Sequence, residues 1–403
     1  MAGTAPSDLG AISQNPDQKA KTEQYRSALH TFLASGHVEA CKAFVDHMLT
    51  DDVPLVISRQ LLQVFAQEIC KLPAAVHRPV ASYALEHIQP RVVSFEEPVT
   101  HLRENLALLL EREEDWSRAA QTLAGIDLDS GLRNVDTQYK LSKNIKIAML
   151  YLEDEDSVNA EVYIKKAAAL IGSCKDDCLE LQYKTCYARI LDSKRRFLEA
   201  ALRYYELSSM GARTVGGTMI GEDDLAQALG SAITCTILAA AGAQRSRMLS
   251  TLYKDERSCH LPVFPFLEKM YLERVLRRDE VLTFAGTLKA HQMAELSDGS
   301  TVLDRAVMQH NLLSASKLYK NISIQELGNL LGVPMAKAEA LAADMIKEGR
   351  LPGSIDQVEA LIRFDDKVEP LLQWDDQIAC VCNQVNAIMD DFVAVMGIKA
   401  AAG

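Results

Sequence analysis

Small and large apolar residues recur at fixed spacing through the first half of the chain. Ala119, Ala160 and Ala200 stand 41 and 40 residues apart. Each has a bulkier residue four positions later and another alanine twelve positions earlier, and these partners are Leu123, Ile164, Tyr204, Ala107, Ala148 and Ala188. Because residues four apart share one face of a helix, the pattern predicts helical hairpins whose alanines let two helices approach closely.

A charged elbow separates the two helices of each hairpin, at residues 113–115, 153–156 and 194–196. No proline occurs between Pro98 and Pro262, which favours consecutive helices because proline breaks helix interiors. A single hairpin cannot bury its own apolar face, so such units stack. We therefore expect an all-α fold that begins with a right-handed, tetratricopeptide-like solenoid over residues 21–210. Solenoids of this kind hold other proteins.

Glycines interrupt the helical pattern most densely between residues 211 and 221. We expect a flexible, glycine-rich loop over residues 211–222, followed by helices over 223–300 that begin a second domain. The segment 216–221 superficially resembles a phosphate-binding loop. It lacks the preceding strand and the following lysine and hydroxyl residue of that motif, so an interhelical loop is the better interpretation.

After residue 300 the pattern changes to that of a small mixed domain. An amphipathic helix is predicted over 304–319, and its apolar face consists of Ala306, Val307, His310, Leu313, Ser314 and Leu318. On this face a histidine is expected to be a hydrogen-bonded core residue rather than a metal ligand.

Short strands and turns follow this helix. An extended segment at 321–323 leads into a capping box formed by Ser323 and Glu326, which opens a helix to residue 331. A turn containing Gly332 precedes a helix over 335–347, and two short strands are predicted at 351–355 and 360–364. Helix, strand, helix, turn, helix and hairpin in this order predict a winged helix over 301–366.

The last predicted helix, over residues 370–397, has the most regular periodicity in the chain. Its apolar residues are spaced alternately three and four apart, and they are Leu371, Trp374, Ile378, Val381, Val385, Ile388, Phe392 and Val395. This heptad seam is typical of helices that form a bundle with other helices. The alternative is that the helix folds back on its own solenoid. The strict period favours an intermolecular bundle, followed by a short tail over 398–403.

Composition and charge narrow the functional classes. The 403 residues are 48% apolar and 24% charged, with a net charge of −12, which opposes general binding to nucleic acid or to an anionic membrane. Residues 1–20 are polar, predict a flexible N-terminus and show no secretion signal. Nine cysteines without such a signal indicate reduced thiols in the cytoplasm or nucleus.

Catalytic and metal-binding patterns are weak. No two of the nine histidines are separated by a single residue, as a metalloprotease-type isopeptidase requires. The pairs Cys174 with Cys178 and Cys380 with Cys382 lack a second half at zinc-ligand spacing. We therefore expect neither enzymatic activity nor a metal or other cofactor.

Solenoid, winged helix and terminal bundling helix together resemble the PCI proteins, a class shared by the proteasome lid, the signalosome and a translation initiation factor. Several strings are similar to those of the signalosome members of this class. They lie at residues 57–62, 88–97, 235–238, 244–249, 254–257, 303–306, 310–319 and 354–357.

This resemblance implies a non-catalytic scaffold subunit within a hetero-oligomer of about eight chains. Such a complex removes a ubiquitin-like modifier from cullins, a reaction called deneddylation, and its zinc site belongs to another subunit. Sibling subunits would bind at the winged-helix edge and at the C-terminal seam. The edge residues would be Asn321, Ile322, Ser323, Ile362 and Phe364. The solenoid would face a cullin–RING ligase, with no contact to nucleic acid or membrane.

Two alternatives stay open from the sequence. The equivalent subunit of the proteasome lid has the same architecture in a different complex. A nucleic-acid adaptor would use the third helix of the winged helix, but that helix carries Lys337 and Lys347 against Glu339 and Asp344. A groove-reading helix should be basic on its exposed face, so protein assembly is favoured.

Overall fold

The computed structural model describes residues 7–13, 17–128, 135–172, 174, 176–211, 213–215, 218–295, 299–364 and 370–396. The chain divides into two compact units, Met1–Cys235 and Thr236–Gly403. The fold is mainly helical, and the predicted all-α solenoid followed by a winged helix is confirmed. The finer domain boundaries given above stay predictions, and the tail at 398–403 lies outside the described residues.

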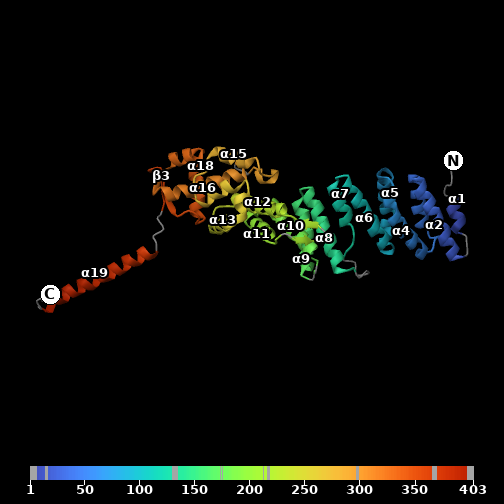
Figure 1. Ribbon diagram of the computed structural model, residues 1–403, viewed down its shortest axis with the longest axis horizontal. Coiled ribbons are helices and arrows are strands. Elements are labelled where there is room, and N and C mark those ends of the chain that lie inside the picture. Colours follow the sequence, from blue (N-terminus) through green and yellow to red (C-terminus); the bar gives the residue numbers. More distant parts are fainter. Residues whose placement is uncertain are drawn as a thin grey trace. The chain divides into compact units, whose positions relative to one another are not determined.

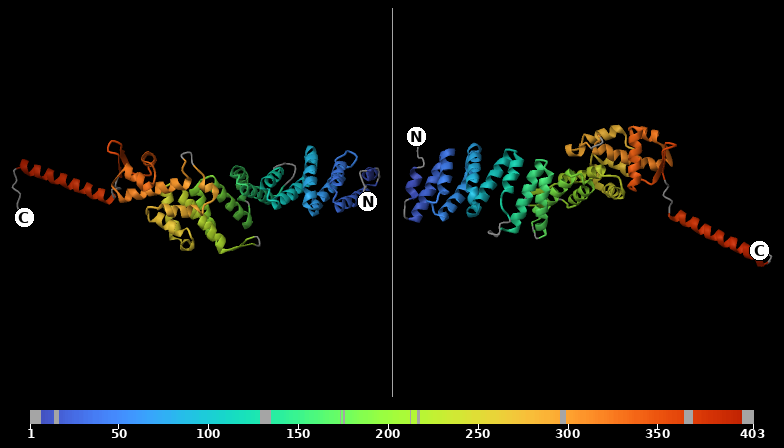
Figure 2. Two further views of the ribbon diagram at one scale, coloured as in Figure 1. Left: turned by 90° about the horizontal axis from the view of Figure 1, so that it is seen from above. Right: turned by 180° about the vertical axis from the view of Figure 1, so that it is seen from behind.

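Antiparallel helices stand side by side in chain order through the first unit, as Figure 1 shows and the two views of Figure 2 confirm. Its elements are α1 (Ser7–Ser13), α2 (Gln18–Ser35), α3 (Val38–Met48), α4 (Leu55–Glu68), η1 (Ile69–Lys71), α5 (Ala74–Ile88), η2 (Gln89–Ser94), α6 (Glu96–Arg112), α7 (Trp116–Ala124), α8 (Thr137–Glu153), α9 (Ser157–Ile171), α10 (Asp177–Ser193), α11 (Phe197–Ser208), β1 (Arg213–Val215) and β2 (Thr218–Ile220). Helix α12 (Glu222–Leu238) continues into the second unit.

The predicted repeat appears as three hairpins, α6–α7, α8–α9 and α10–α11. Ala119, Ala160 and Ala200 have no exposed surface, and the bulkier residues four positions later are buried beside them. Because a methyl group occupies little space, the backbones of neighbouring helices come close at these positions and many weak dispersion contacts add up.

Each elbow contains one residue in the left-handed region. Glu114, Glu155 and Arg195 have φ of 61°, 61° and 60°, and so repeat at the same spacing as the alanines. The next N–H then donates to a carbonyl five residues back, as Asp156 does to Tyr151 at 2.9 Å. This ends the first helix with a C-terminal cap. The Asp156 carboxylate also accepts from the N–H groups of the following turn and so caps the second helix.

Two segments contain elements that the sequence analysis did not foresee. Within residues 1–20, α1 forms and its Leu9 is buried in the core of the first unit, while the flexibility expected of this segment stays a prediction. A loop was expected over 211–222, but β1 and β2 pair there as an antiparallel hairpin with Val215 opposite Thr218. Residues with β-branched side chains flank the Gly216–Gly217 pair in the sequence, a composition that favours a two-residue hairpin.

In the second unit, further helices lead into the winged helix. The elements are α13 (Ala243–Lys254), η3 (Glu256–His260), α14 (Phe264–Tyr271), α15 (Arg278–Ala285), η4 (Ala290–Met293), α16 (Val302–Leu318), β3 (Asn321–Ser323), α17 (Ile324–Leu331), α18 (Met335–Lys347), β4 (Gly353–Asp356), β5 (Leu361–Phe364) and α19 (Pro370–Met396). The small core of the winged helix lies between its three helices and one face of the sheet and includes Leu312, Leu327, Ala342 and Met345.

Helix α16 carries buried polar side chains that hold irregular segments in place. Gln309 Oε1 accepts from the Ala241 N–H at 3.3 Å and from Arg350 Nη1 at 2.9 Å. The Asn311 amide exchanges two hydrogen bonds with the backbone of Leu276, at 2.8 and 3.2 Å. Backbone groups outside helices and strands need such partners when they are buried. Helix α16 therefore fixes the path of the chain at Ala241 and at Leu276.

His310 belongs to the same buried face. Its Nε2 lies 2.9 Å from the Arg274 carbonyl oxygen, and the side chain is a hydrogen-bonded core histidine as predicted. Burial lowers the pKa of His310 to about 4. Leu318, by contrast, was expected on this face but is 70% exposed, because it is the last residue of α16 and lies beyond the core.

We expect Ala160→Leu to lower the free energy of unfolding by about 1–3 kcal/mol, because the added carbons have no space at a fully buried helix contact. Chemical denaturation of the full chain measures this. The control, Ala168→Leu, makes the same change at an exposed position of α9 and should stay within about 0.5 kcal/mol of wild type. Equal effects of the two variants would contradict the close approach.

Acidification should destabilise the protein partly through His310. Its folded-state pKa of about 4 lies below the ordinary 6.5, so the unfolded chain binds more protons between these values. Stability contributed by the neutral imidazole is present above pH 6.5 and declines toward pH 4, by at most about 3 kcal/mol.

The measurement compares unfolding free energies at neutral and acidic pH. His310→Gln, which retains a donor for the Arg274 carbonyl, should lose this part of the acid sensitivity. His260→Gln, at an exposed histidine, should keep the wild-type profile. An unchanged profile in His310→Gln would show that the group does not titrate as its burial indicates.

Candidate functional site

The C-terminal helix α19 presents an apolar stripe that no described residue covers. Trp374, Ile378, Val381, Val385, Ile388 and Phe392 are each more than half exposed. The side chains of Leu371 and Val395 lie outside those that the structure describes. Large apolar side chains in a continuous row at heptad spacing mark an interaction surface rather than ordinary exposed residues. The stripe therefore has the chemistry of a helix-bundling surface.

The sequence did not single out Met389, which is 58% exposed and directly follows Ile388. In a heptad it flanks the seam rather than belonging to it, and flanking apolar residues widen the surface that a partner helix buries. Its position next to the seam residue Ile388 is the sequence feature that could have identified Met389 as part of this surface.

The winged-helix sheet has three strands in the order β3–β5–β4. Among the strands that the structure describes, β3 pairs with β5 alone, with Asn321 opposite Arg363 and Ser323 opposite Leu361. The Phe364 N–H donates to Lys320 and the Ile324 N–H donates to Ala360, at 2.8 and 2.9 Å. Because bonding alternates along an antiparallel strand, the backbone groups of Asn321 point away from β5. They form an open edge to which another strand can add.

Ile362 and Phe364 are not at this edge. Both belong to β5, the central strand, and their exposed fractions are 0% and 7%. Their side chains pack into the winged helix's own core together with Ile322. The structure thus differs from the sequence-based placement, which had no information on strand order. Asn321 and Ser323 remain as edge residues that a partner can reach.

Leu318 and Tyr319 lie one residue before β3, separated from it by Lys320, and are 70% and 47% exposed. An apolar pair beside an open strand edge gives a partner both backbone hydrogen bonds and surface to bury. Sequence reasoning missed this pair because Leu318 fits the helical period of the core face. The sequence feature that could have indicated its exposure is its position at the end of the predicted helix, beyond the residues that pack in the core.

Helix α18 has no excess of positive charge. It carries two lysines and two acidic residues, and Glu339 accepts a hydrogen bond from Gln357 Nε2 of the wing at 2.6 Å. A nucleic-acid-reading helix needs a basic exposed face, so the charge pattern favours protein contacts.

Within the described residues, no three histidine, cysteine, aspartate or glutamate side chains are grouped so that they could hold a metal ion. In the same part of the chain, no helix combines the length and hydropathy needed to cross a bilayer.

Comparison with family models separates the chain into the same two parts. A model described as "PSMD12/CSN4, N-terminal" matches residues 10–212, and the PCI domain model matches residues 288–366. The chain therefore carries a PCI domain after its helical solenoid, in agreement with the resemblance seen in the sequence.

Curated relatives define the family more narrowly. The chain is 57% identical over 374 residues to COP9 signalosome complex subunit 4 of Arabidopsis thaliana. The matched residues cover 93% of this chain and 94% of that protein. The subunit 4 proteins of Dictyostelium discoideum and Drosophila melanogaster are 48% and 46% identical, covering 95% of this chain and 95% and 93% of theirs. The chain belongs to the COP9 signalosome subunit 4 family.

The placement of Ile362 in the core leads to a stability prediction. Ile362→Ala should lower the free energy of unfolding of the second unit by about 2–5 kcal/mol, through lost contacts and a cavity. Leu318→Ala, at an exposed residue near the sheet edge, should change it by less than about 0.5 kcal/mol. Thermal or chemical unfolding decides this. A small change in the free energy of unfolding of Ile362→Ala would contradict the burial of this side chain in the core.

Proposed function

We propose that this chain is a non-catalytic scaffold and substrate-positioning subunit of a signalosome, the complex that removes a ubiquitin-like modifier from cullins. The observation that carries the proposal is the uncovered apolar stripe of α19. Family membership supports it, because the curated relatives are named as subunits of the COP9 signalosome complex. By deneddylating cullins, the complex regulates cullin–RING ubiquitin ligases.

The surfaces described above are suited to binding. The β3 edge offers backbone donors and acceptors, and α19 offers aliphatic and aromatic side chains. Sibling subunits would add a strand to this edge and helices to this stripe. The isopeptidase reaction would take place on another subunit, whose position the assembly fixes.

The solenoid of the first unit would contact the cullin–RING ligase. Its stacked hairpins form a continuous surface built from several successive repeats, which is suited to a large protein substrate. A place in the cytoplasm and nucleus is supported by the nine cysteines, none of which forms a disulfide in the structure, as expected of a reducing compartment.

Two other functions are less well supported. The family model of the N-terminal part joins PSMD12 and CSN4 in one description, so that part alone fits either complex. The curated relatives that match along most of the chain are named for the signalosome, which favours it over the proteasome lid. A nucleic-acid adaptor is disfavoured by the balanced charges of α18.

Assembly through α19 should depend on the apolar character of its stripe. We expect the triple variant Val381→Asp, Val385→Asp and Ile388→Asp to lose its place in the complex. Three carboxylates buried without partners cost several kcal/mol or more, while the same residues left exposed cost little. Co-purification of sibling subunits with the tagged chain, followed by mass spectrometry, measures the loss.

A matched control places three aspartates on the polar side of the same helix, at Asn383, Asn386 and Ala387. This variant adds the same charge but should assemble normally. Full assembly of the stripe variant, or equal loss in both variants, would remove the stripe from the proposed function.

A further inference from the structure

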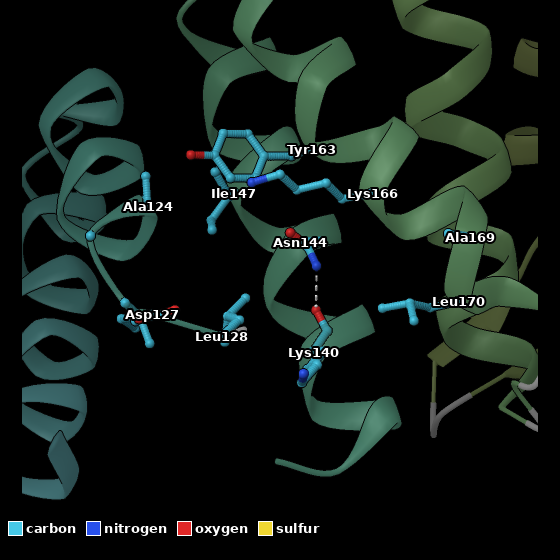
Figure 3. A pocket seen from close by; sticks show the side chains of 12 residues that line it. Ala124, Asp127, Leu128, Lys140, Asn144, Ile147, Tyr163, Lys166, Ala169 and Leu170 are labelled. Carbon is cyan, nitrogen blue, oxygen red and sulfur yellow. Dashed lines mark hydrogen bonds between the residues drawn. The ribbon is translucent and has the colours of Figure 1, made fainter. Parts of the chain in front are cut away.

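A pocket of about 560 Å³ lies between hairpins α6–α7 and α8–α9 in the first unit, at the end of α7 and along α8 and α9 (Figure 3). Its volume is in the range of ligand-binding pockets in proteins. Apolar residues line the pocket from the segment after α7, from α8 and from α9, among them Ile126, Leu128, Ile147 and Leu170. Ile147 is 1% exposed and forms part of the pocket floor.

Asn144 is a polar residue within this largely apolar floor. It is 5% exposed, and its Nδ2 donates to the Lys140 carbonyl oxygen at 2.9 Å. Its Oδ1 accepts no hydrogen bond from the described residues, and Figure 3 shows this oxygen turned away from Lys140. The oxygen is not among the fully enclosed side-chain atoms of the described residues that lack a partner, so it is open to the pocket and can accept from an N–H group that enters it.

Lys166 provides an accessible positive charge at the rim. Its Nζ lies 5.0 Å from the ring centroid of Tyr163, which also lines the pocket, and no described carboxylate pairs with it. The preceding Lys165 differs, because it pairs with Glu161 at 3.3 Å. Asp127 and Lys140, also in the lining, already make interactions within the chain.

We infer that this pocket binds an extended segment of a protein partner that carries an acidic residue next to an apolar one. A backbone N–H of the segment donates to Asn144 Oδ1, and its carboxylate pairs with Lys166. The apolar side chain enters the pocket against Ile147 and Leu170. In a chain of net charge −12, an unpaired lysine beside an apolar cavity selects for an acidic partner by charge complementarity.

This inference does not depend on the proposed function. It concerns one pocket in the first unit and needs neither the α19 stripe nor the sheet edge. It is therefore tested on the purified full-length chain without sibling subunits.

The probe is a library of displayed random decapeptides selected against the full chain. We expect enrichment of peptides that contain an acidic residue adjacent to an apolar residue. Fluorescence anisotropy with labelled copies of the enriched peptides then measures affinity. Lys166→Glu should weaken binding at least about tenfold through charge reversal, and the loss should shrink at high salt.

Lys165→Glu is the matched control, since it reverses the neighbouring charge outside the pocket and should leave affinity within about twofold. Asn144→Leu removes the acceptor and should also weaken binding about tenfold. Its thermal unfolding is recorded to show that the solenoid stays folded. No enrichment, enriched peptides without acidic residues, or equal effects of Lys165→Glu and Lys166→Glu would each overturn the inference.

Discussion

Close contact between helices at small side chains is the constraint on which the first unit depends. Ala119, Ala160 and Ala200 have no exposed surface, so the backbones of α7, α9 and α11 lie near their neighbours. Each hairpin buries its apolar face only against the next, and the solenoid is a sum of such contacts. The left-handed elbows keep consecutive hairpins alike, because they turn the chain in the same way at Glu114, Glu155 and Arg195.

The second unit adds buried polar contacts to its apolar packing. The buried side chains of α16 hydrogen-bond to the backbone of two irregular segments and to Arg350 at the end of α18. These bonds act together with buried apolar side chains such as Leu267 and Leu303 to position the winged helix against the helices before it. Strand β3 is already paired with β5, so a partner that adds a strand does not first have to order this edge.

Local and periodic features could be predicted from the sequence, but tertiary order could not. The repeat, the three short strands and the helix ending at Lys347 follow from spacing, capping and turn residues. The central position of β5 does not, because strand order is set by packing between segments distant in the chain. Asn144 also escaped sequence reasoning. A polar residue among apolar ones looks like an interruption of a helix face until the neighbouring hairpin defines a cavity around it.

Four ion pairs that join hairpins α6–α7, α8–α9 and α10–α11 have the same orientation. Lys143 and Lys146 of α8 pair with Glu104 and Glu111 of α6, while Arg189 of α10 and Lys194 of the next elbow pair with Glu153 of α8 and Glu161 of α9. In these four pairs the earlier hairpin supplies the acid and the later hairpin supplies the base. Single exposed pairs stabilise little, yet a reversed hairpin would set like charges against each other. The stack of hairpins therefore has a direction, and its two ends are not interchangeable.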